Sequence, residues 1–456
     1  MISTSGLHVD QAPPLHIPFR FFATAPLFMI FAGVVLFLWQ GDLFLAPLVP
    51  QTVALVHLAV LGWITMVMVG ALYQMFPVLA GVPVPWPGLV PWVHGLLIFG
   101  LVSMFLGIGA DGHAWWLLAA SVGLGPAVGL FLIQIYVALF RAATRHPSVW
   151  AMGISSVALA STLAMGAVFL GEYAHGFMAL DREAMVGIHL TWGLLGWIGT
   201  LIMGVSFQVL PMFYMMPEFP TRAGGWILAG VSATLLLLPA ALYLYPETPD
   251  IWWLAGGPGL IAVGFYSVIT AKLLVRRKRT YPDLTFRFWQ LGFLSGALSL
   301  LVLATWPAQE GEAWRFLFGV LFIMGWATSV ILGMLYKIVP FLVWFHRFSN
   351  LAGLVEIPMM DDLVPEKVAR VHFIAHTLSV VLLSLAAGLG YEWAIPAGGV
   401  ALGVSGVILA YSIWFAWRQE PPEAPEMPDF DSFFKPGGPL DKGNLENTPD
   451  GGQVIS

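Results

Sequence analysis

Three segments share one spaced pattern, and this pattern decides the expected fold: GWITMVMVGALYQMFP over 62–77, GWIGTLIMGVSFQVLP over 196–211 and GWATSVILGMLYKIVP over 325–340. Each segment opens with Gly-Trp and places a second glycine eight residues after the first. A Gln or Lys follows four residues later, and a proline three residues after that. The copies are shifted by 134 and then 129 residues, and so many matched positions indicate an internal threefold repeat.

Each copy lies in a long apolar run, and the rest of the chain has the same character. Of its 456 residues, 59% are hydrophobic and 10% are charged, whereas soluble proteins average about 25% charged residues. Twelve apolar runs are long enough to cross a bilayer, four for each copy of the pattern. The sequence therefore predicts an all-α integral membrane protein of 12 transmembrane helices in three pseudo-symmetric four-helix repeats, at about 19–145, 146–280 and 281–418.

The two ends of the chain and its basic side chains predict how it lies in the membrane. Residues 1–18 are polar and lack the charged and apolar regions of a signal peptide. Residues 419–456 hold eight acidic and two basic side chains, which predicts a disordered acidic tail. With the N-terminus inside, most basic residues fall on the inner side, while Arg182 and Arg315 fall outside. We expect a multi-pass protein of the cell membrane, a bacterial inner membrane, with both ends cytoplasmic.

Residue types that are missing exclude several kinds of function. Cysteine is absent, which rules out disulfides, thiolate metal sites and iron–sulfur clusters. The formal charge of −6 gives no support for nucleic-acid binding, so the lipid bilayer is the expected environment. No acidic residue lies in the middle of an apolar run, which argues against an ordinary ion-coupled transporter or a proton pump. Any bound metal must rely on histidine, carboxylate or thioether ligands.

The main interpretation of the repeated pattern is structural. Glycines eight residues apart lie roughly 80° apart around a helix and offer a small-residue stripe for close helix contact. The proline leaves a backbone carbonyl without its donor, and Gln74 and Gln208 are placed to help satisfy it. Lys337 takes their position in the third copy, where its ammonium either reaches the inner surface or marks a polar cavity. A hydrophilic path through all three side chains is the alternative.

Two histidines lie deep enough in apolar runs to be site candidates. His57 and His189 each lie about 10 Å along the helix from the expected outer end. Imidazole there is costly unless it is hydrogen-bonded or bound to a metal, so both interpretations stay open. The positions are not equivalent in the repeat, because His57 precedes its first glycine by five residues and His189 by seven. The sequence does not decide whether they serve one centre or two.

A second group of histidines is expected near the inner face. His372 and His376 are four residues apart and share one face of their helix, and His346 ends the preceding run. A helical histidine pair with a third ligand is one way to build a metal site. Interfacial histidines that bond to loop carbonyls and lipid headgroups are the other interpretation.

Twelve spans in three four-helix units, with polar positions on spans two, six and ten, resemble subunit I of the haem–copper oxidase superfamily. The segment PFRFF over 18–22 is similar to the start of the NnrS family, which is associated with nitric oxide stress and thought to bind haem and copper. The resemblance implies three arcs of helices around pores that hold haem and copper. By position, it implies that His57 matches a haem ligand and that His189 lies on the helix that bears a copper ligand.

The chain departs from the oxidase pattern where the catalytic ligands lie. His189 is followed by Leu190-Thr191 rather than Pro-Glu, and span seven contains no histidine. Span ten has none in its interior. A complete oxygen- or nitric-oxide-reducing centre is therefore not expected, and whether the protein is an oxidoreductase stays open.

The sequence is compatible with three functions. The first is a membrane protein that binds haem, copper or both in electron transfer or in nitrogen-oxide or respiratory metabolism, with an electron-donor or respiratory-complex protein as partner. The second is a carrier or channel for a small neutral or anionic solute, in which Lys337 has no acidic partner. The third is an assembly factor for a respiratory or metal-loading complex that docks through residues 419–456.

Overall fold

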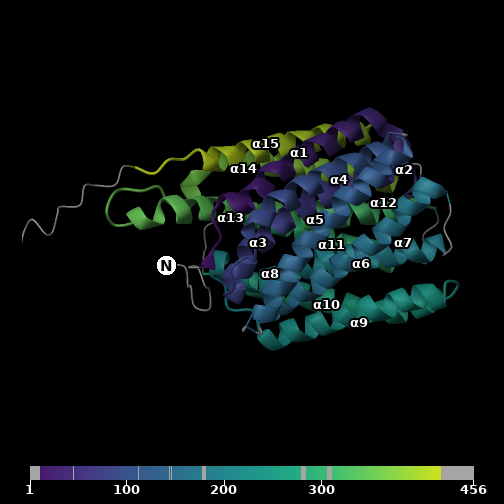
Figure 1. The fold of residues 1–456 in the computed structure, drawn as a ribbon, viewed down its shortest axis with the longest axis horizontal. Coiled ribbons are helices and arrows are strands. Elements are labelled where there is room, and N and C mark those ends of the chain that lie inside the picture. The colour runs from purple at the N-terminus through teal and green to yellow at the C-terminus, as the bar shows by residue number, and fades with distance from the viewer. Residues whose placement is uncertain are drawn as a thin grey trace, which may run out of the picture.

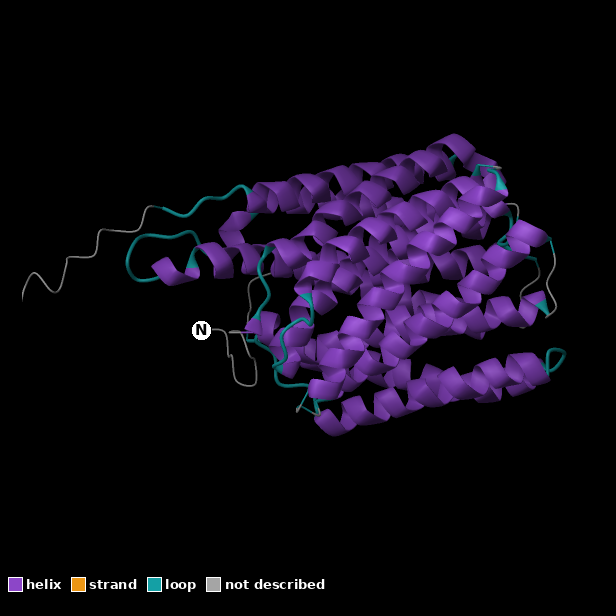
Figure 2. Ribbon diagram, viewed as in Figure 1, coloured by secondary structure: helices purple, strands orange, loops and turns teal. Residues whose placement is uncertain are grey.

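The chain folds into a bundle of long helices. The computed structural model describes residues 11–44, 46–110, 112–142, 144, 146–176, 181–278, 284–305 and 311–422, and these contain helices and loops but no β-strand (Figure 2). Twelve spans are long and apolar enough to cross a membrane. The predicted fold class, an all-α multi-pass membrane protein, is confirmed. The predicted tail lies outside the described residues from 423 onward.

The spans follow one another with short connections. Nine of them are built on single α-helices: α1 (His16–Trp39), α4 (Val90–Gly109), α5 (Ala114–Arg141), α6 (Pro147–His175), α9 (Thr221–Leu244), α10 (Pro249–Val275), α11 (Leu284–Ala304), α14 (Glu366–Leu389) and α15 (Ala394–Trp417). The other three are the spans that carry the repeated pattern, and each is an α-helix, a π-helical segment and a second α-helix in sequence. They are α2 (Pro50–His57), η3 (Leu58–Thr65) and α3 (Met66–Ala80); α7 (Arg182–Leu190), η5 (Thr191–Gly199) and α8 (Thr200–Tyr214); and α12 (Ala313–Gly319), η7 (Val320–Thr328) and α13 (Ser329–Arg347).

The helices run roughly parallel to the long axis of the molecule (Figure 1). We call the end where α1 begins and α15 ends the terminal side, and the opposite end the distal side. The terminal side also carries the loop between α13 and α14, which contains η9 (Met360–Leu363) and projects from the bundle at the left of Figure 1.

The repeated glycines bring each long span against the first helix of its own four-helix group. A Cβ atom added at Gly62 or Gly70 would lie 2.6–2.7 Å from side-chain atoms of Phe28 or Phe21 of α1. Equivalent contacts join Gly196 and Gly204 to Ala158 and Ala151 of α6, and Gly325 and Gly333 to Ser295 and Phe288 of α11. In each group the two contacted positions are seven residues apart. These are the close helix contacts that the glycine spacing predicts; threefold symmetry of the whole chain stays a prediction.

The three π-helical segments meet near the centre of the bundle through tryptophan side chains. The indole Nε1 of Trp63 donates to the hydroxyl of Thr328 at 3.0 Å, and Nε1 of Trp197 donates to Thr65 at 2.9 Å. Thr65 and Thr328 each stand two residues after the repeated tryptophan, where the second copy has Gly199. Trp326 is the third repeated tryptophan, and Gly199 at the corresponding position has no side chain that could accept its N–H. Trp326 lies instead on the wall of a cavity.

The three groups are joined unequally. Helix α1 lies along α15, and α5 lies along α6, so the first group packs closely on both of the others. The second and third groups meet near the terminal side, where the Tyr214 hydroxyl lies 2.7 Å from Thr285 and the guanidinium of Arg277 lies over the ring of Phe286. Farther toward the distal side, α10 packs on α9 while α11 packs on η7 and α13. A large space is left between them.

Replacing Thr328 with valine should destabilise the bundle. The substitution nearly preserves the side-chain shape but removes the acceptor of the buried Trp63 N–H, and an unpaired buried donor costs about 1–3 kcal/mol. Thr377→Val is a matched control, because Thr377 donates to a carbonyl of its own helix, as Thr328 also does. Thermal unfolding in detergent should give a lower Tm for T328V than for T377V. Equal values would show that the contact between the two spans contributes nothing.

Candidate functional site

A cavity of about 1440 Å³ lies among the three groups and extends into the space between the second and the third. Its walls come from the distal halves of the three long spans and from α6, α10 and α11. Most of the lining side chains are Leu, Val, Ile, Ala, Phe and Gly, as expected of a space enclosed by membrane-spanning helices. Charged side chains on its wall lie at the distal ends of the helices: Asp181, Arg182, Glu183, Glu247 and Arg315.

His57 and His189 both lie on the wall of this cavity, at the same depth. Each stands seven residues after the first residue of its helix, which is about 10 Å along the axis. Their ring centroids are 6.2 Å apart, and the ring planes are inclined by 39°. The structure therefore brings the two predicted histidines together in one place.

The two rings meet although their positions differ within the repeated pattern. His57 is the last residue of α2, and His189 is the residue before last of α7, so each is followed closely by a π-helical segment. Two neighbouring helices that are related by rotation face each other with opposite flanks. A pair of side chains that meets across such flanks comes from different positions of the pattern, and His57 and His189 do so. π-Helical segments are also frequent at functional sites.

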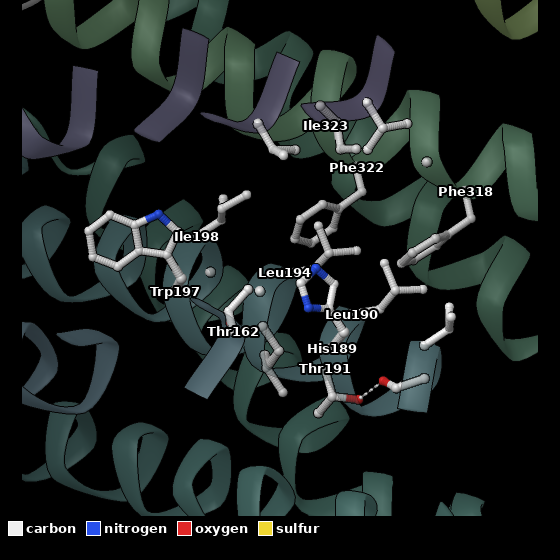
Figure 3. Close-up of a pocket in the computed structure, with 18 of the residues that line it drawn as sticks. Thr162, His189, Leu190, Thr191, Leu194, Trp197, Ile198, Phe318, Phe322 and Ile323 are labelled. Carbon is white, nitrogen blue, oxygen red and sulfur yellow. Dashed lines mark hydrogen bonds between the residues drawn. The ribbon is translucent and has the colours of Figure 1, made fainter. Parts of the chain in front are cut away.

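Hydrogen bonds leave one nitrogen of each ring available. Nδ1 of His57 lies 2.7 Å from the carbonyl oxygen of Val53, so Nδ1 carries the proton and Nε2 keeps its lone pair. Nδ1 of His189 is buried without a well-formed hydrogen bond, on the side where the backbone of Thr162 interacts with the ring. Nε2 of His189 points away from Thr162, toward Phe322 (Figure 3). Both imidazoles thus line the cavity, and the Nε2 atom of each ring takes no part in these contacts.

The surroundings of His189 are aromatic and aliphatic. The ring of Phe169 lies edge-on to His189 with centroids 5.5 Å apart. Phe318 and Phe322 approach from the third group, and their own centroids are 5.8 Å apart (Figure 3). The hydroxyl of Thr191 is already used, since it donates to the Gly187 carbonyl at 2.8 Å. An imidazole in such a setting has little water around it and is kept neutral, the form that ligates metals.

The distance between the histidines fits a shared metal. Imidazole nitrogens bind metals at about 2 Å, so two rings that ligate one ion from opposite sides have centroids about 6 Å apart. The observed centroid distance of 6.2 Å is in this range. Among the residues that the structure describes, no three His, Asp or Glu side chains converge as a metal site. The protein would therefore supply two imidazole ligands, His57 and His189, a donor type that would suit haem or copper.

His372 and His376 are used differently. Both are buried within the third group, where Nδ1 of His372 lies 2.8 Å from the Tyr336 hydroxyl and Nε2 lies 2.8 Å from Ser405. Nε2 of His376 lies 2.8 Å from the Ser329 hydroxyl. These bonds join α13, α14 and α15 across the interior of the group. Polar side chains that bond between helices in this way stabilise packing in membrane proteins.

His346 does not complete a metal site with that pair. Its Nδ1 lies 2.9 Å from the carbonyl oxygen of Leu342, and its Nε2 lies 3.2 Å from that of Pro13 in the N-terminal segment. A carbonyl oxygen accepts a hydrogen bond from an N–H group. A ring nitrogen that donates to a carbonyl therefore carries a proton and has no lone pair for a metal. The contacts therefore favour the hydrogen-bonding interpretation of His346 and His372, while Nδ1 of His376 is buried without a hydrogen-bond partner. No third ligand among the described residues joins the pair, so the predicted metal site there gains no support.

The hydrophilic path expected through Gln74, Gln208 and Lys337 does not coincide with the cavity, since none of the three lines it. Gln74 is buried with its Oε1 unpaired, and Gln208 is half-buried. Lys337 is 2% exposed, and its Nζ lies 3.2 Å from Oδ1 of Asp361 on η9. The expectation that Lys337 has no acidic partner was wrong, because the loop after its helix folds back and supplies one.

Comparison with known proteins does not assign a family. The chain matches no protein-family model, and no similar protein is found among curated sequences. The resemblance to haem–copper oxidase subunit I and to the NnrS family therefore stays a proposal.

Several contacts at these sites were not predicted, for different reasons. Asp361 lies 24 residues beyond Lys337, and nothing in the sequence shows how that loop folds. Phe318 and Phe322 carry no signal in an apolar run that is rich in aromatic residues. The tryptophan–threonine bonds did have a signal, because Thr65 and Thr328 share one position of the repeated pattern.

Removing the partner of Lys337 should cost stability. Asp361→Asn leaves a buried ammonium without its carboxylate, and we expect a loss of about 1–3 kcal/mol, less than for a fully buried pair because Asp361 is half-exposed. Asp362→Asn is the matched control, since Asp362 accepts from the Met359 backbone instead. Unfolding in detergent should show a lower Tm for D361N than for D362N, and Lys337→Met should recover part of the loss in the D361N background. Indistinguishable Tm values for D361N and D362N would contradict the pairing.

The proximity of the two cavity histidines can be tested by cross-linking. Because the chain has no cysteine, His57→Cys/His189→Cys introduces the only two thiols. A short bifunctional thiol reagent should join them within one chain, which mass spectrometry of the digested protein would detect. His57→Cys/His376→Cys should stay unlinked, since His376 lies inside the third group. Equal linkage of both pairs, or linkage of the control alone, would contradict the arrangement of the spans.

Proposed function

We propose that this protein binds haem or copper in a membrane through His57 and His189 and uses it in electron transfer or nitrogen-oxide or respiratory metabolism. The observation that carries the proposal is the 6.2 Å separation of two imidazole rings on the wall of one apolar cavity. When bound, such a group supplies a redox-active metal. The chain contributes two neutral ligands and walls that exclude water, conditions that tune the potential of a metal centre.

The proposal stops short of oxidase chemistry. Besides the two histidines, no third His, Asp or Glu of the described residues joins the site, and the family's further ligands are missing from spans seven and ten. The protein proposed here is a relative of haem–copper oxidase subunit I in architecture, with a reduced ligand set. Its redox partner would be an electron-donor or respiratory-complex protein.

The orientation belongs to the same proposal. Basic residues gather at the terminal side, where α1 begins near Arg20, α5 ends at Arg141 and α9 begins near Arg222. At the distal side, Arg182 and Arg315 pair with carboxylates, at 3.4 Å from Glu172 and 3.1 Å from Glu312. The positive-inside rule then places both chain ends in the cytoplasm and opens the cavity toward the outer face of the cell membrane.

A carrier function has less support. It relied on a polar path and on an unpaired cation, whereas Lys337 has a carboxylate partner and the cavity is apolar beyond its charged rim. A charged solute would lose its hydration in such a space without compensating contacts.

The decisive experiment is an absorption spectrum with metal analysis of the purified protein, before and after dithionite. Protein expressed with haem and copper supplied should show a Soret band or stoichiometric copper. His57→Ala and His189→Ala should each lose most of it, because each removes one of two ligands. His346→Gln is the control, since His346 is a hydrogen-bonded histidine outside the cavity.

Each possible outcome bears on a different part of the proposal. Colourless, metal-free wild-type protein would overturn the proposal. Retention of the cofactor in both alanine variants would move the site away from the two histidines, and loss in H346Q alone would point to the terminal side.

A further inference from the structure

The cavity opens sideways between α10 and α11. Val268 of α10 and Ala297 of α11 both line it, and both side chains are exposed, Val268 by 52% of its surface. The two helices pack on other neighbours, α10 on α9 and α11 on η7 and α13. The wall of the cavity is therefore incomplete along this edge.

The opening lies at the depth of the lipid tails. Val268 is seven residues from the terminal-side end of α10, and Ala297 is thirteen residues from that of α11. At 1.5 Å per residue, these positions are about 10 and 20 Å from the terminal side. Both fall within a hydrocarbon layer of about 30 Å. Molecules that enter here come from the bilayer and not from water.

The charges of the cavity select against an ionic ligand. Its rim carries three carboxylates (Asp181, Glu183 and Glu247) and two guanidinium groups. Both arginines are already paired, Arg182 with Glu172 and Arg315 with Glu312. The rim thus has no excess of positive charge to attract an anionic headgroup. Trp252, Trp253 and Trp314 also line this end, the type of side chain that lies at membrane interfaces.

The volume indicates a ligand with a long chain. Sites for small molecules enclose about 300–1,000 Å³, and this cavity of 1440 Å³ is larger. It extends from the charged rim past His57 and His189 to Leu383 and Leu402 in the third group. A chain of methylene or isoprenoid units would cover this apolar surface and be withdrawn from water.

We propose that the cavity binds a long-chain lipid with an uncharged headgroup, which enters from the bilayer between α10 and α11. The chain lies in the cavity beside the two histidines, and the headgroup stays at the distal rim. This inference goes beyond the proposed cofactor and does not require it, because the opening, the apolar walls and the rim exist without a metal.

The chain offers a matched pair of variants on one helix. A Cβ atom added at Gly264 or at Gly257 of α10 meets no atom within 4 Å, so a side chain at either position begins in open space. Gly264 lines the cavity four residues from Val268, whereas Gly257 does not line it. Gly264→Leu should therefore narrow the side opening, and Gly257→Leu should leave it unchanged.

The test uses the full chain in phosphatidylcholine nanodiscs with a long-chain alcohol that carries a photoreactive diazirine. Mass spectrometry should find labelled residues on the cavity faces of α10 and α11. G264L should lower this labelling severalfold and G257L should not. The corresponding fatty acid, which is anionic at neutral pH, should label the cavity less.

The result also distinguishes this inference from the proposed cofactor. His57→Ala/His189→Ala should keep the labelling, so loss of metal with labelling retained leaves the lipid site standing. Labelling confined to outward-facing positions such as Leu254, or equal labelling in G264L and G257L, would overturn it. Equal labelling by the alcohol and the fatty acid would overturn the preference for an uncharged headgroup.

Discussion

The close approach of three long spans to the first helix of their groups is the contact on which the rest of the structure depends. At six positions the repeated pattern has glycine, and a Cβ atom at any of them would come within about 3.1 Å of the neighbouring helix. In a membrane, helices gain little from hiding apolar surface from water, so such backbone proximity provides much of the packing energy. It brings the three spans to the centre of the bundle, where Trp63 and Trp197 bond to threonines of other groups.

The same arrangement explains where the cavity lies. The central spans fix the three groups to one another, while the outer helices must close the gaps between groups. Helices α1 and α15 close one gap, and α5 and α6 close another. The hairpin of α9 and α10 packs mainly on itself and on α6, α7 and η5, so the third gap stays open. The two candidate ligands lie on the cavity wall near this junction, His57 on the long span of the first group and His189 on that of the second.

Much of this architecture was predictable, because it follows from patterns with a direct physical meaning. Apolar length predicts spans, and glycine spacing predicts close contacts, and both predictions agree with the structure. The depth of His57 and His189 could also be read from the sequence, but their meeting could not. Side chains that face each other across two neighbouring spans can occupy different positions of the repeated pattern. The unequal positions of His57 and His189 in that pattern therefore gave no indication that the two side chains meet. The partner of Lys337 was unpredictable for another reason: Asp361 comes from a loop whose path no periodicity describes.

The histidines of this chain show why residue type alone does not identify a site. His372 and His57 are both intramembrane imidazoles, yet the hydroxyls of Tyr336 and Ser405 occupy both nitrogens of His372. At His57 a backbone carbonyl holds Nδ1, and the ring lies on the wall of an open volume that a second histidine shares. A buried polar group whose hydrogen bonds are complete contributes to packing. One that keeps a free lone pair beside an enclosed space is retained at a cost in stability, and binding of a ligand there would offset that cost.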